Sequence, residues 1–89
     1  MIEDRFHASV DSPMAPSEFC FSITPSDIED LSYATKAIYV GEGGDITLRS
    51  LRGNEDVTFR NVSSGMILDV RALAVRATGT TALDLVGLG

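Results

Sequence analysis

The chain has 89 residues, enough for one domain at most, because domains usually contain on the order of 100–150 residues. Its 13 acidic and 7 basic side chains give a net charge of −6, which argues against a nucleic-acid-binding protein. One cysteine, Cys20, and one histidine, His7, exclude an internal disulfide and a multi-histidine or cysteine-rich metal site. The first residues lack the pattern of a secretory signal, and no apolar run approaches the ~18 residues of a membrane span. We therefore expect a small soluble protein that binds neither nucleic acid nor membrane.

Charge and composition divide the chain near residue 35. Residues 1–35 contain seven acids and one arginine, whereas residues 36–89 contain six acids and six bases, so the net charge lies on the first part. All three prolines precede this point and all eight glycines follow it. The sequence therefore predicts an acidic N-terminal arm over residues 1–30 and a folded domain over residues 31–89.

The N-terminal part shows no sustained hydrophobic periodicity. Residues 19–23 form a short apolar patch that suits a strand, and Cys20 within it is expected to be a small buried hydrophobe. Thr24 as N-cap, Pro25 at the first helical position and Asp27 in the first turn predict the start of a short helix.

Two interpretations of this N-terminal part remain open: a disordered tail, or an arm that orders on a partner. Aromatic content favours the arm, because disordered tails are usually poor in such residues. The side chains expected to dock the arm on its partner are Phe6, Phe19, Phe21 and Ile23.

The remainder of the chain has strand character almost throughout. Residues 45–49 and 56–60 alternate strictly between apolar and polar side chains, as half-buried strands do. The other expected strands cover residues 37–40, 66–71, 73–77 and 82–86. Hairpin turns are expected at residues 41–44 and 78–81. About six short strands with frequent turns predict an all-β fold, a small antiparallel β-sandwich of jelly-roll-like or barrel-like form.

No catalytic, cofactor or metal motif is recognised in the sequence. The glycine-rich segment 41–44 lacks the lysine and the following helix of a phosphate loop. Asp27, Glu29 and Asp30 lack the spacing and the glycine of a calcium loop. No serine occurs in a nucleophile elbow, and His7 has no evident nucleophile beside it. We therefore expect a protein that is not an enzyme and has no cofactor.

Arginines and acids alternate on the outward side of the expected strands. Along the chain, Asp45 accompanies Arg49, Asp56 accompanies Arg60, and Asp69 accompanies Arg71. These residues form ion pairs on a solvated face or, alternatively, a contact between copies of the chain, where arginine is enriched. Tyr39 is also expected to point outward, opposite to its neighbours. The candidate subunit interface therefore consists of Tyr39, Arg49, Arg60, Arg71 and Arg76.

A series of short segments stands in a fixed order along the chain and ends with Ala77-Thr78-Gly79-Thr80-Thr81-Ala82. The earlier segments are 23–27, 34–41, 44–46, 57–62, 65–68 and 70–71, together with Leu31. This ordered series resembles the head-spike base protein of gene transfer agents and related tailed phages. The chain departs from the family pattern at Asp69, where proline is expected, and at residues 87–89, where an aromatic end is expected.

The resemblance implies a structural virion protein on the surface of a phage-like particle head, made in the bacterial cytoplasm. Such proteins form a ring of copies, five in the family, on a capsid vertex and link the capsid protein to a spike fibre. The alternative, from another class, is a small carbohydrate-binding β module that contacts host surface glycan directly. For that role the chain offers only two tyrosines and no tryptophan.

Overall fold

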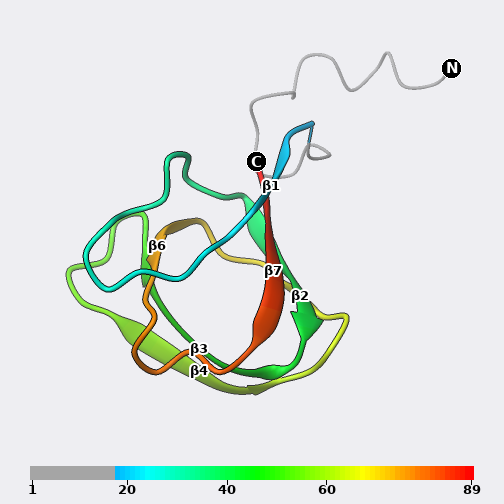
Figure 1. Ribbon diagram of the computed structural model, residues 1–89. Coiled ribbons are helices and arrows are strands. Elements are labelled where there is room, and N and C mark those ends of the chain that lie inside the picture. Colours follow the sequence, from blue (N-terminus) through cyan, green and yellow to red (C-terminus); the bar gives the residue numbers. More distant parts are fainter. Residues whose placement is uncertain (1–17) are drawn as a thin grey trace, which may run out of the picture.

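The computed structural model describes residues 18–89, which form seven strands in two antiparallel sheets around one core (Figure 1). The four-stranded sheet has the order β1-β7-β2-β5, and the three-stranded sheet has the order β4-β3-β6. The predicted all-β antiparallel sandwich is therefore confirmed. The strands are β1 Cys20–Ser22, β2 Ala37–Glu42, β3 Gly44–Ser50, β4 Val57–Val62, β5 Ile67–Leu68, β6 Ala72–Val75 and β7 Leu83–Leu88.

The core lies between the two sheets and is built from alternate residues of their strands. Ile38 and Val40 of β2 and Ile46 and Leu48 of β3 are at most 1% exposed. Strict alternation sends their neighbours to the outer faces, as period-two side-chain geometry requires. Apart from Thr35 and Thr47, the buried residues that the structure describes are all hydrophobic or glycine.

The glycine-rich segment after β2 is a crossing between the sheets, so the hairpin predicted at residues 41–44 is wrong. β2 belongs to the four-stranded sheet and β3 to the three-stranded sheet. A Cβ atom on Gly44 would lie 2.6 Å from Thr81 Oγ1, and one on Gly41 would lie 2.6 Å from Asp84 Cβ. These glycines therefore permit close approach of two chain segments at the corner of the sandwich.

The hairpin predicted around residues 78–81 is also wrong, because β6 and β7 lie in different sheets. Thr80 and Thr81 instead bind β3: their hydroxyls accept hydrogen bonds from the N–H groups of Thr47 and Asp45, at 2.9 Å each. The connection is therefore held to β3 of the three-stranded sheet before the chain crosses to β7 in the four-stranded sheet.

Residues 23–36 form a strap that runs from β1 to the free edge of β6 and back to β2 (Figure 1). Ile23 N–H donates to Leu85, and further along the strap the N–H groups of Ser26, Leu31 and Thr35 donate to carbonyls of residues 72–75. The strap thus closes one side of the sandwich across both sheets and covers an edge that would otherwise be unpaired.

The helix start predicted within this strap, at residues 24–27, is wrong. The hydroxyl of Ser26 accepts hydrogen bonds from the N–H groups of Ile28 and Glu29, at 3.3 and 3.1 Å, which makes a local turn. Such side-chain bonds compete with helix formation. Because the N–H groups of Ser26 and Leu31 already bind β6, the backbone is satisfied without a helix.

Two polar residues attach the strap to the sandwich. The hydroxyl of fully buried Thr35 accepts from Ala72 N–H at 2.9 Å and donates to the Val70 carbonyl at 3.0 Å. The carboxylate of Asp27 accepts from the N–H and hydroxyl of Thr78 at 2.8 and 2.7 Å. These two bonds hold the pKa of Asp27 below its ordinary value of 3.8, and the bond from the Thr78 backbone N–H has the larger effect.

Candidate interaction surfaces

The outer face of the four-stranded sheet carries no charged side chain over most of its area. Tyr39 of β2 lies in register with Ile67 of β5 on one side and Val86 of β7 on the other. Ile67 is 57% exposed and Tyr39 is 39% exposed, which confirms that Tyr39 points outward. We call this surface the charge-free face; it consists of Cys20, Ser22, Ala37, Tyr39, Ile67, Val86 and Leu88.

The alternation of side chains along β1 explains why Cys20 lies on this face. Phe21 turns inward and packs against the core, so Cys20 turns outward and is exposed, contrary to the prediction that it is buried. Asp84, whose φ is 56°, lies near the start of β7, at the end of the face near the β2–β3 corner. Its carboxylate marks one border of the face.

The outer face of the three-stranded sheet carries ion pairs, and we call it the ionic face. The Asp56 carboxylate lies 3.3 Å from Arg49 Nε and 3.4 Å from Arg76 Nε, and Arg76 also reaches Asp30 at 3.6 Å. Only 11% of the Arg76 side chain is exposed. Asp30 lies on the strap, so this network joins the strap to the sheet.

The ion-pair partners differ from those that the sequence predicted. Asp45 contacts Arg60 on the neighbouring strand, at 3.3 Å, and not Arg49. Within residues 18–89, no ion pair joins Asp69 to Arg71. Residues four apart on one strand are separated by about 13 Å, whereas residues opposite each other on paired strands are close together. Strand register therefore decides the pairs.

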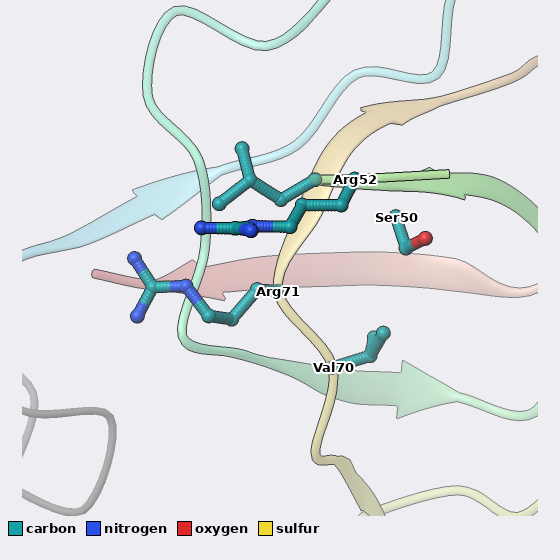
Figure 2. Close-up of a pocket in the computed structure, with 5 residues that line it drawn as sticks. Ser50, Arg52, Val70 and Arg71 are labelled. Carbon is teal, nitrogen blue, oxygen red and sulfur yellow. The ribbon is translucent and has the colours of Figure 1, made fainter. Parts of the chain in front are cut away.

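The fifth predicted interface residue, Arg71, lies at the end of the sandwich, just before β6. Its side chain lines a shallow concavity of about 460 Å³ together with Ser50, Leu51, Arg52 and Val70. The long side chains of Arg52 and Arg71 extend to the same side (Figure 2). The five residues predicted as one interface are therefore divided among three surfaces: the charge-free face, the ionic face and this end.

The predicted docking residues also separate. Phe6 lies outside the described residues. Phe19 is 45% exposed, Phe21 is half-buried and Ile23 belongs to the core. Phe19 and Phe21 form an aromatic cluster with Tyr33, with ring centroids 4.9 to 6.0 Å apart.

Tyr33, Arg52 and Ile67 are among the exposed residues here that the sequence-based interface and docking predictions did not include. For Ile67 a signal was present, since the inward alternation expected for Leu68 and Val70 places it outward. Tyr33 and Arg52 lie outside the regular strands, where alternation gives no direction.

Within residues 18–89, the structure places no group of three or more histidine, cysteine or acidic side chains where they could hold a metal ion. In the same residues, no helix is long and apolar enough to cross a membrane.

Similarity to known proteins is found among solved structures. No protein-family model matches the chain, and no curated protein matches it. Among solved structures, the chain is similar to a chain in the capsid of a native gene transfer agent particle, computed with C5 symmetry. The two are 40% identical, with a TM-score of 0.81, over 98% of this chain and 100% of that chain.

Proposed function

The chain belongs to the same family as this component of the gene transfer agent capsid, and from that premise we propose that it is a structural, non-enzymatic protein of a phage-like particle. It forms the base of a spike on a capsid vertex and links the capsid to a spike fibre. The observation that carries the proposal is the similarity over the full length of both chains, at 40% identity. The particle head surface is then its location, after synthesis in the bacterial cytoplasm.

The base is a ring of five copies, in which the charge-free face of each copy packs against a different surface of the next copy, because a closed ring requires head-to-tail contacts. Ile67 and Tyr39 expose apolar surface there with no charge among their register neighbours. Contiguous exposed apolar surface marks interaction sites, and depletion of charge is typical of the centre of an interface. Association also stabilises a small domain, because binding favours the folded state.

The N-terminal part, residues 1–30, docks the ring on the capsid. Within it, Phe21 and Ile23 act by anchoring β1 and the strap on the core, whereas Phe19, packed on Phe21 and Tyr33, is 45% exposed. An acidic segment suits a basic capsid surface by charge complementarity.

The experiment measures the native mass of the purified chain and its attachment to spike-free particles. A closed ring of five copies that attaches to particles supports the proposal. A variant lacking residues 1–17 keeps β1 and is expected to fold and associate but not to attach. Attachment of that variant at the wild-type level contradicts the docking role, and a chain that neither associates nor attaches contradicts the spike base.

Direct glycan binding is a second candidate, favoured by one concavity of about 310 Å³. Its lining includes the exposed Tyr33, the carboxylates of Glu29 and Asp30, and the hydroxyl of Ser32. An aromatic platform beside hydrogen-bonding groups suits a sugar ring, which has an apolar face and a polar rim. A glycan array with wild type and Tyr33→Ala separates the two roles. A spike base without its fibre gives no signal, whereas a glycan module gives one that Tyr33→Ala removes.

A further inference from the structure

Two arginines differ from the others in the described part of the chain. Arg49, Arg60 and Arg76 each contact a carboxylate of their own chain. No carboxylate within residues 18–89 lies at ion-pair distance from Arg52 or Arg71, and no hydrogen bond within those residues engages either guanidinium. Both charges are therefore available for an external anion.

The fold brings these two residues to one place. Ser50, the last residue of β3, lies in register with Ala72 of β6, after a break in the register at Arg49. Leu51 N–H then donates to the Arg71 carbonyl at 2.8 Å, and Gly53 N–H closes the turn on the Ser50 carbonyl at 3.0 Å. Both side chains extend to the same side from these two hydrogen-bonded segments (Figure 2) and line the same concavity.

The lining of the concavity is partly apolar. Leu51 is 40% exposed, and Val70 is half-buried against the core. A guanidinium matches a carboxylate or a phosphate through two parallel hydrogen bonds. Two positive charges that line one concavity repel each other, and a bound anion offsets this repulsion. The site therefore combines the two positively charged guanidinium groups of Arg52 and Arg71 with an apolar wall formed by Leu51 and Val70.

We propose that Arg52 and Arg71 form a docking site for an acidic segment of a partner protein, in which a carboxylate stands next to an apolar side chain. The carboxylates bind the two guanidinium groups, and the apolar side chain covers Leu51 and Val70. This apolar wall distinguishes the ligand from inorganic phosphate, which gains nothing from it. This docking site requires neither the ring nor the charge-free face.

The test follows the side-chain Nε–Hε signals of the arginines by NMR while a capped peptide of alternating leucine and glutamate is added to the full chain. We expect the Arg52 and Arg71 signals to shift in a saturable manner. The double variant Arg52→Gln/Arg71→Gln should bind at least about tenfold more weakly, as the loss of two charge-assisted contacts implies. The matched control is Arg60→Gln, whose wild-type side chain is 74% exposed on the ionic face; it should bind within about twofold of wild type.

Several results would overturn the proposal. One is the absence of a saturable shift at Arg52 and Arg71 up to about 10 mM peptide, and another is equal binding by the double glutamine variant. Equal binding of a peptide with serine in place of leucine would leave only a simple anion site. Stronger binding of heparin than of the peptide at these two arginines would assign the site to an anionic polysaccharide.

Discussion

The ionic face and the charge-free face lie on opposite sides of the same core, and they differ in how their side chains find partners. On the ionic face, Arg49, Asp56, Arg76 and Asp30 contact one another within the chain. On the charge-free face, Ile67 is 57% exposed, and the register row of Ile67, Tyr39 and Val86 contains no charged side chain. A face whose charges are paired internally needs no partner, whereas exposed apolar surface is stabilised by one.

The largest effect is expected from a charge on the charge-free face. Tyr39→Lys should weaken self-association about 100-fold or more, because a lysine buried without a partner costs several kcal/mol. The fold should persist, since Tyr39 is already 39% exposed. Sedimentation measures the association, and circular dichroism checks the fold. Arg60→Glu on the ionic face is the matched control and should associate normally; wild-type association of Tyr39→Lys would remove the distinction between the faces.

A smaller effect is expected from Arg76 on the ionic face. Arg76→Met should lower the free energy of unfolding by about 1–3 kcal/mol, because the Arg76 side chain is only 11% exposed and binds the carboxylates of both Asp30 and Asp56. Urea denaturation measures the loss. Arg49→Met is the control and should cost less, because the Arg49 side chain is 35% exposed and that of Arg76 is 11% exposed. Equal losses would show that burial does not set the strength of this network.

The strap should add a small pH dependence through Asp27. Its pKa is lowered in the folded chain, so its contribution to stability is present above the ordinary value of 3.8 and is lost as the pH falls through the lowered folded pKa. Between about pH 5 and about pH 2, wild type should therefore lose more stability than Asp27→Asn. Denaturation at several pH values measures this difference, and parallel curves would contradict it.

The smallest effect is expected from the exposed pair on the ionic face. Arg60→Ala should change the free energy of unfolding by at most about 0.5 kcal/mol, because the Arg60 side chain is 74% exposed and water screens its contact with Asp45. Urea denaturation at low and high salt measures it. A loss above about 1 kcal/mol would mean that this pair belongs to the same cooperative network as Arg76.

The two faces also differ in which of their features could be predicted from the sequence. Alternation around Ile46, Phe59 and Ile38 predicted the strands and the outward direction of Tyr39, because side-chain direction along a strand has a period of two. The same reasoning could not identify the partner of Asp45, since that depends on which residue of β4 lies opposite. Arg52 and Arg71 are distant in the sequence, and only the turn after β3 brings them to the same concavity.

An antiparallel all-β domain could be predicted from the sequence, because apolar periodicity is a local property that each short segment carries. The assignment of each strand to a sheet depends instead on long-range contacts. Gly41 and Gly44 suit a hairpin turn and a crossing between sheets equally well, and the choice depends on contacts with Asp84 and Thr81, about forty residues away. The same long-range pairing left one outer face ionic and the other free of charge, since register sets which outward side chains become neighbours.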